Sequence, residues 1–266
     1  MTSAPKAPAF CLFSGAIAGK GVTRRAFCTH SPDTTPMPSP TIALFDIDGT
    51  LIVTGGTGRR SVNRAFLKMY GRADACDSFG FDGMTDRLIA RMGLEAIGVE
   101  ATPEAIDAWL AEYLIALEDE VSRADGASFR LLPGMQEAIA AAQAAEMAVG
   151  LGTGNVREGA RIKLERVGVH HHFRFGGFGC DAEARPEVIR LAAERGAEQL
   201  GLPLSGCRVV VIGDTPRDVE AARAIGAECI GVATGRYSVA DLQASGAHYV
   251  FPDFSNGAAI AALLAV

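Results

Sequence analysis

The sequence of 266 residues lacks closely spaced cysteines, long apolar runs and any excess of positive charge. Its six cysteines include no Cys-x-x-Cys pair, which favours free thiols in a reducing compartment over a zinc or redox site. No apolar run approaches the ~18 residues that a membrane-spanning helix needs, so we expect a soluble protein without a membrane partner. The formal charge of −6 argues against a nucleic-acid partner, because such proteins carry a basic patch.

Residues 1–40 have no acidic residue before Asp33 and are rich in Ala, Pro, Ser, Thr and Gly. Low acidity with Arg and Ser is typical of a transit peptide. The apolar stretch Ala9 to Ala18 precedes the arginines, which is the wrong order for a secretory signal. A disordered extension, or a start codon placed upstream of a true start at Met37, is an alternative. We expect a cytoplasmic protein, or an organellar one if residues 1–36 are a transit peptide.

Two carboxylates end the first apolar run of the chain. The run Thr41 to Phe45 is followed by Asp46-Ile47-Asp48-Gly49-Thr50. Carboxylates at i and i+2 lie on the same side of an extended backbone, and two like charges that close need a cation or a shared proton. In open α/β sheets ligands bind beyond the carboxyl ends of the strands, where Mg²⁺ is held by a few carboxylates and substrate oxygens. The alternative is that Asp-Gly-Thr is an ordinary turn.

Polar side chains also follow two later predicted strands. The strand Met147 to Gly152 ends at Thr153-Gly154-Asn155, where a hydroxyl and free N–H groups before a helix form a seat for an anion. The Val/Ile-rich run Arg208 to Gly213 suits a buried parallel strand and ends at Asp214-Thr215-Pro216-Arg217-Asp218. Asp214 and Asp218 are therefore expected near Asp46. The alternatives are that these segments only cap helices.

These three motifs, in this order, resemble the first, second and fourth motifs of the haloacid dehalogenase-like phosphohydrolase superfamily, over roughly Thr41 to Phe254. The resemblance implies a nucleophile at Asp46 that forms an aspartyl-phosphate, and a general acid–base at Asp48. It also implies Mg²⁺ held by Asp46, the Asp48 backbone carbonyl and Asp214. Asp218 would orient these ligands or their waters. The phosphoryl oxygens would be held by Thr153 and the Gly154 N–H.

The third motif of that superfamily usually offers a Lys about thirty residues after the second. This chain has Arg185-Pro186 at a spacing of 185 − 153 = 32 residues from Thr153. Arg can stabilise the phosphoryl group with a bidentate fork. Lys163 is a second candidate for binding phosphate, but it lies roughly 15 Å further along the helix axis. The sequence therefore favours Arg185 as the catalytic cation, unless Arg185 is only a surface charge at a helix start.

Helices are predicted between the first and second motifs, over Arg59 to Tyr70, from Thr85-Asp86 and from Thr102-Pro103. This insertion resembles the C1-type cap of phosphoglycolate phosphatase-like members. Later strands at Glu228 to Val232 and His248 to Phe251, alternating with helices, predict a parallel sheet covered on both faces. The predicted organisation is an α/β, Rossmann-like core domain over residues 41–54 and 131–266, a helical cap over 55–130, and an extension over 1–40. Hinges are expected at residues 54–56 and 130–134.

Mg²⁺-dependent hydrolysis of a small phosphomonoester, similar to phosphoglycolate or a sugar phosphate, is the leading hypothesis for function. A sugar phosphomutase would keep the same two carboxylates, and a non-catalytic module that binds partners or nucleotides is the alternative from another class. A dehalogenase or phosphonatase is disfavoured because Asp48 is present. The expected partner is a small phosphorylated metabolite. The protein is expected to be a monomer or a homodimer. Which of Arg59, Met84, Arg87 and Arg91 faces the crevice is left open.

Overall fold

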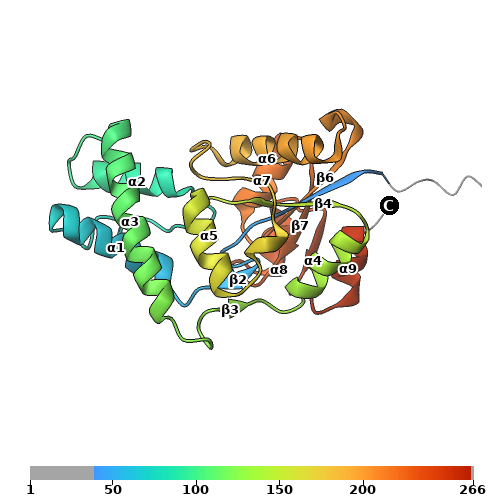
Figure 1. Cartoon of the computed structure of the whole chain (residues 1–266), viewed down its shortest axis with the longest axis horizontal. Coiled ribbons are helices and arrows are strands. Elements are labelled where there is room, and N and C mark those ends of the chain that lie inside the picture. The colour runs from blue at the N-terminus through green and yellow to red at the C-terminus, as the bar shows by residue number, and fades with distance from the viewer. Residues whose placement is uncertain (1–38, 265–266) are drawn as a thin grey trace, which may run out of the picture. The chain divides into compact units, whose positions relative to one another are not determined.

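The computed structural model describes residues 39–264, which belong to one compact unit built around a six-stranded parallel sheet (Figure 1). The strand order is β5-β4-β1-β6-β7-β8. The strands of this sheet are β1 (Thr41–Phe45), β4 (Ala148–Gly152), β5 (Gly176–Gly177), β6 (Arg208–Gly213), β7 (Glu228–Val232) and β8 (Tyr249–Phe251). The α/β prediction is confirmed, and the short strand β5 is one that the sequence pattern did not show.

Helices cover both faces of this sheet, as Figure 1 shows. Along β1, Ala43 and Phe45 pack into one core with α4 and α9, whereas Ile42 and Leu44 pack into a second core with α6 and α7. Both sides of β1 are therefore apolar, as expected for a central parallel strand. From residue 135 onward, helices alternate with the strands of the sheet. These helices are α4 (Met135–Ala144), α5 (Arg157–Arg166), α6 (Arg185–Leu200), α7 (Pro216–Ala224), α8 (Val239–Ala244) and α9 (Gly257–Leu264).

A helical insertion leaves and rejoins the sheet through a second, two-stranded ladder. Strands β2 (Ile52–Val53) and β3 (Arg130–Leu131) pair antiparallel, and between them lie α1 (Thr57–Tyr70), α2 (Asp86–Ala96) and α3 (Pro103–Arg123). Both predicted hinge segments adjoin this ladder. The division into a core and a cap stays a prediction, because all of these elements belong to the same compact unit.

Local sequence explains where these inserted helices begin. The Thr85 hydroxyl accepts a hydrogen bond from the Leu88 N–H, and the Thr102 hydroxyl accepts one from Ala105 N–H, so both threonines cap their helices. Trp109 of α3 is completely buried, stacks on Tyr113 at 5.3 Å between ring centroids, and lies 4.9 Å from the Phe66 ring of α1. The aromatic side chains of α3 are therefore part of the core of the insertion.

The expectations about residues 1–38, including the transit peptide and the start at Met37, lie outside the described residues. Four cysteines are described, and all are free: Cys76, Cys180, Cys207 and Cys229. Among residues 39–264, none of the helices has the length and apolar character to cross a membrane.

Replacing Trp109 with alanine is expected to destabilise the fold by about 3–5 kcal/mol, since the substitution leaves a cavity beneath α1. The matched control on the same helix is Ile115→Ala, because Ile115 is 61% exposed and should change stability by about 0.5 kcal/mol or less. Urea denaturation of both variants beside wild type measures the difference. Equal losses in the two variants would show that the three aromatic rings do not form the core of the insertion.

Candidate active site

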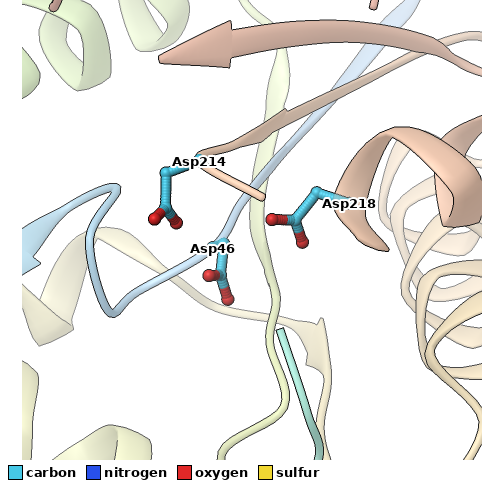
Figure 2. A group of neighbouring side chains, drawn as sticks. All are labelled: Asp46, Asp214 and Asp218. Atoms are coloured by element: carbon cyan, nitrogen blue, oxygen red, sulfur yellow. The ribbon is translucent and has the colours of Figure 1, made fainter. Parts of the chain in front are cut away.

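Three carboxylates meet at the carboxyl edge of the sheet. Asp46 follows β1 and Asp214 follows β6, which are neighbouring strands paired through Phe45 and Ile212, while Asp218 lies in the first turn of α7. One oxygen from each carboxylate lies within 4.8 Å of the others, and Figure 2 shows the three side chains converging. All three are buried. The sheet order therefore brings together the acidic residues that the sequence analysis selected.

Asp218 has protein donors on both of its oxygens. Its Oδ2 accepts hydrogen bonds from the Thr215 N–H at 3.1 Å and from the Thr215 hydroxyl at 2.8 Å, and its Oδ1 accepts one from Arg185. Thr215 is the N-cap of α7, so the capping interpretation holds for Thr215 and not for Asp214. Asp218 is thus placed to orient its neighbours rather than to bind an ion through both oxygens.

The carboxylate of Asp214 occupies space that two glycines leave open. A Cβ at Gly49 would lie 2.4 Å from Asp214 Oδ2, and one at Gly235 would lie 1.8 Å from the same atom. Gly49 also has a φ of +81°, which disfavours other residues. The Thr50 hydroxyl donates to Asp214 Oδ1 at 3.1 Å. The Asp-Gly-Thr segment is a turn, and it also shapes the position of Asp214.

Burial makes this cluster of carboxylates costly to ionise. It raises the pKa of Asp46 to about 6, an effect that Arg185 opposes and Asp218 adds to. It also raises the pKa of Asp214 well above its ordinary value, with further contributions from Asp218 and Asp46. A divalent cation among these oxygens would relieve the repulsion, and an all-oxygen donor set suits Mg²⁺. The residues present therefore fit the metal that the resemblance implies.

Arg185 is a buried cation in direct contact with the carboxylates, not a surface charge at a helix start. Its Nη2 forms an ion pair with Asp46 Oδ1 at 2.9 Å, and it donates hydrogen bonds to Asp218 and to the Gly152 carbonyl at 2.9 Å. Burial disfavours the charged form, but Asp218 and Asp46 hold the pKa of Arg185 above its usual value. Its Nε and Nη1 are buried and have no partner in the described part of the chain. Two nitrogens thus remain available to a ligand.

Lys163 also reaches the site, although it lies ten residues beyond Thr153. Its Nζ donates to Asp48 at 2.7 and 2.9 Å and to Asn155 Oδ1 at 2.6 Å. The separation is shorter than expected along a helix axis, because α5 begins only at Arg157 and Lys163 lies fewer than two turns into it. Helical side chains also point back toward the N-terminus, which shortens the reach from Lys163 to Asp48.

The Thr153-Gly154-Asn155 turn packs directly against the start of α2. The Thr153 hydroxyl is buried and accepts from the Asn155 side-chain amide at 2.9 Å. A Cβ at Gly154 would lie 2.0 Å from the Met84 carbonyl oxygen, so only glycine fits there. The Asp86 N–H donates to the Gly154 carbonyl at 2.8 Å, and Asp86 Oδ2 accepts from the Val156 N–H at 2.8 Å. The phosphate seat predicted from sequence is thus in contact with the helical insertion.

Asp86 is a residue that sequence reasoning missed as part of the site. The sequence placed it in the first turn of a helix, where an acidic residue is common. In the structure it bonds instead to the N-terminus of α5, and burial raises its pKa to about 6 while Lys163 opposes the rise. No local signal identifies this contact, because Asp86 and Val156 are 70 residues apart.

A cavity of about 190 Å³ lies above these groups. The core supplies Asp46, Asp48, Lys163, Arg185 and Asp214, and the insertion supplies a mostly apolar wall that includes Arg59, Val62, Met84, Ile89 and Tyr113. Of the four candidates left open, Arg59 and Met84 line the cavity. Arg87 and Arg91 do not line it, and they form ion pairs with Asp107 and Glu183.

Known proteins resemble this chain in sequence family and in fold. A family model described as haloacid dehalogenase-like hydrolase matches residues 40–226. No curated protein matches the chain. The structure resembles CbbY from Rhodobacter sphaeroides in complex with phosphate, with a TM-score of 0.63, 20% identity, and coverage of 82% of this chain and 96% of that one.

Two further structures are similar. A predicted phosphoglycolate phosphatase from Haemophilus somnus gives a TM-score of 0.61 at 17% identity, covering 83% of this chain and 97% of that one. A protein assigned as a β-phosphoglucomutase from Thermotoga maritima gives 0.55 at 19% identity, covering 84% and 98%. At these identities the likeness shows the fold. Because the family model spans more than half of its length, the chain belongs to the haloacid dehalogenase-like hydrolases.

Saturating Mg²⁺, at about 100 times its Kd, is expected to raise the melting temperature by about 5–10 °C at pH 7.5. The rise should shrink toward pH 5.5, because protons compete for carboxylates whose pKa values are raised, that of Asp46 to about 6. Asp214→Asn should abolish the rise. The substitution should also stabilise the metal-free protein at pH 7.5. A carboxyl group with a raised pKa lowers the free energy of unfolding once it is forced to ionise at higher pH, and asparagine carries no such charge.

Thermal melts with and without Mg²⁺ at both pH values measure these effects. Asp77→Asn, at an exposed carboxylate away from the cluster, is the matched control and should keep the full response. A response that survives in Asp214→Asn would place the metal elsewhere.

Proposed function

We propose that the protein hydrolyses a small phosphomonoester, through an aspartyl-phosphate formed on Asp46, in the presence of Mg²⁺. The observation that carries this proposal is the pairing of two groups at one cavity. Asp46 and Arg185 both line the cavity, and two buried nitrogens of Arg185 have no hydrogen-bond partner among residues 39–264. A nucleophile beside a cation suits phosphoryl transfer. The transition state of that reaction spreads negative charge over the equatorial oxygens, which cationic N–H donors stabilise.

Each residue then has a role that follows from its position. An Asp46 oxygen attacks phosphorus, and Asp48 gives a proton to the leaving oxygen and later takes one from the attacking water. The phosphoryl oxygens are held by Arg185 Nε and Nη1, the Gly154 N–H and the Thr153 hydroxyl. The metal would be held by Asp46, the Asp48 carbonyl and Asp214, and would neutralise charge between nucleophile and substrate. Asp218 keeps Arg185 in place.

A sugar phosphomutase is the second candidate, favoured by the structural likeness to the Thermotoga maritima protein assigned as a β-phosphoglucomutase. The two activities differ in the acceptor of the phosphoryl group, which is water in one and a sugar hydroxyl in the other. Release of inorganic phosphate therefore separates them. The non-catalytic alternative is disfavoured, because a binding module has no need for three buried carboxylates that repel one another.

Asp46→Asn is expected to lower Mg²⁺-dependent release of phosphate from p-nitrophenyl phosphate by about 10³-fold or more, because the amide cannot form the intermediate. The folded state should persist in the variant. Asp77→Asn should keep wild-type activity. Wild-type crystals soaked with beryllium fluoride should carry the adduct on Asp46. Full activity in Asp46→Asn would remove this residue as the nucleophile, and folded wild type without any turnover would favour the binding module.

The cavity also indicates which leaving group fits. Lys163 and Arg185 are each paired with a carboxylate, whereas Arg59 pairs with none among residues 39–264. Arg59 instead donates to the Cys76 carbonyl at 3.0 Å and the Phe79 carbonyl at 3.1 Å, and its guanidinium lies 3.5 Å from the centre of the Phe81 ring. We propose that its remaining charge binds a second anionic group of the substrate, such as a carboxylate or a second phosphate.

Arg59→Met is expected to raise KM for phosphoglycolate by about tenfold or more, because a hydrogen bond to a charged group contributes about 1.5–3 kcal/mol. KM for phenyl phosphate, which has no second charge, should change little. The matched control is the neighbouring Arg60→Met, since Arg60 is exposed and paired with Glu120. Steady-state kinetics with both substrates measures the contrast. An equal change of KM for the two substrates would mean that Arg59 does not select an anion.

A further inference from the structure

Lys163 is a buried ammonium group whose hydrogen bonds all lead to the predicted acid–base residue and its neighbour. Its Nζ is 2.9 Å from Asp48 Oδ1, 2.7 Å from Asp48 Oδ2 and 2.6 Å from Asn155 Oδ1. Asn155 closes the arrangement by donating from Nδ2 to Asp48 Oδ2 at 2.7 Å. Asp48, by contrast, keeps 40% of its side chain exposed and lines the cavity. Its carboxylate is thus anchored on one side and open on the other.

The two cations at the cavity differ in what they have left to offer. Within residues 39–264, Arg185 has two nitrogens without a hydrogen-bond partner, whereas Lys163 Nζ has three acceptors within 2.9 Å. A phosphoryl group would find free donors on Arg185 and none on Lys163 as it stands. Binding of phosphate therefore suits Arg185, and the contacts of Lys163 suit a different role.

We infer that Lys163, together with Asn155, is a positioning residue that holds the Asp48 carboxylate in the orientation needed to protonate the leaving group. This inference rests on the proposed phosphatase function. Proton transfer is efficient only when donor and acceptor are held in a reactive geometry, and a carboxylate on a turn otherwise rotates freely. Asn155 lies in the turn between β4 and α5, and Lys163 lies in α5 itself. The Asp48 carboxylate is therefore oriented by residues that follow β4 of the sheet and not by residues of the helical insertion.

The contacts also distinguish the two oxygens of Asp48. Oδ2 accepts from both Lys163 and Asn155, whereas Oδ1 accepts from Lys163 alone. We assign Oδ1 as the oxygen that carries the proton. As an Asp46 oxygen bonds to phosphorus, the bond from phosphorus to the leaving oxygen breaks, and the Oδ1 proton passes to that oxygen to give the alcohol. In the second step water bonds to phosphorus, gives a proton to Oδ1, and the bond to Asp46 breaks to release phosphate.

Two aryl phosphates that differ in the basicity of the leaving oxygen test this role. Phenyl phosphate has a basic leaving oxygen that needs the proton, whereas 2,4-dinitrophenyl phosphate has an acidic one that departs without it. Lys163→Met should slow the first turnover of phenyl phosphate by about 100-fold or more, the range that general acid catalysis contributes. It should slow the first turnover of dinitrophenyl phosphate by less than about tenfold. Rapid-quench measurement of the released phenol and of the released 2,4-dinitrophenol gives the two rates.

Arg161→Met is the matched control, because Arg161 is a cation on the same helix whose partners, Glu158 and Glu165, are exposed. Its ratio of the two rates should equal that of wild type. Lys163→Gln keeps an N–H donor without the charge and should give an intermediate ratio, which also decides the matter if Lys163→Met does not fold. An unchanged ratio in the Lys163 variants, whether both rates fall or neither does, would overturn the inference. Wild type inactive on both substrates would instead overturn the proposed function.

Discussion

Repulsion among three buried carboxylates is the constraint on which this site depends. Asp46, Asp214 and Asp218 lie buried together, and in the described part of the chain the cation that pairs with two of them is Arg185. Burial raises the pKa values of Asp46 and Asp214, and the neighbouring carboxylates add to the rise of each. This arrangement is unfavourable for folding alone, and the cation of the proposed function would offset the repulsion. This is the usual relation between stability and function at an active site.

The sheet makes that arrangement possible. Strands β4, β1 and β6 are neighbours in space although they are distant in sequence, so their carboxyl ends bring together residues from three separate motifs. The side chains that follow each strand then have little freedom, because the strands are buried on both faces and their register is set by apolar packing. Gly49 and Gly154 complete the fit where a Cβ would collide with Asp214 or with the Met84 carbonyl.

The features that the sequence predicts correctly are those that depend on a local pattern of residues, namely strands and helix caps. The strands before Asp46, Thr153 and Asp214 show continuous apolar runs, and the threonine caps of α2 and α3 show their own signals, so fold class and the acidic cluster followed. Contacts across long separations in sequence were not accessible. The sequence predicts the distance of Lys163 from Thr153 only by assuming a continuous helix between them. In the structure α5 begins at Arg157 and packs against α3, which the local pattern does not show. Asp86 and Arg59 belong to the cavity only because the insertion lies against the sheet unit.

The division of residues between sheet and insertion separates the chemistry from the choice of substrate. Every group assigned to bond making or proton transfer comes from strand ends or from α5 and α6, whereas the wall that meets the leaving group comes from α1 to α3 and the segment before α2. The two parts touch at Gly154, where the Asp86 N–H bonds to the carbonyl of a predicted phosphate-binding residue. Substitutions in the apolar wall can therefore alter the fit of the leaving group while Asp46 and its neighbours keep their geometry. The contacts of Lys163 with Asp48 fit the same division of roles. Because Lys163 does not belong to the insertion, the orientation of Asp48 does not depend on which leaving group the insertion accommodates.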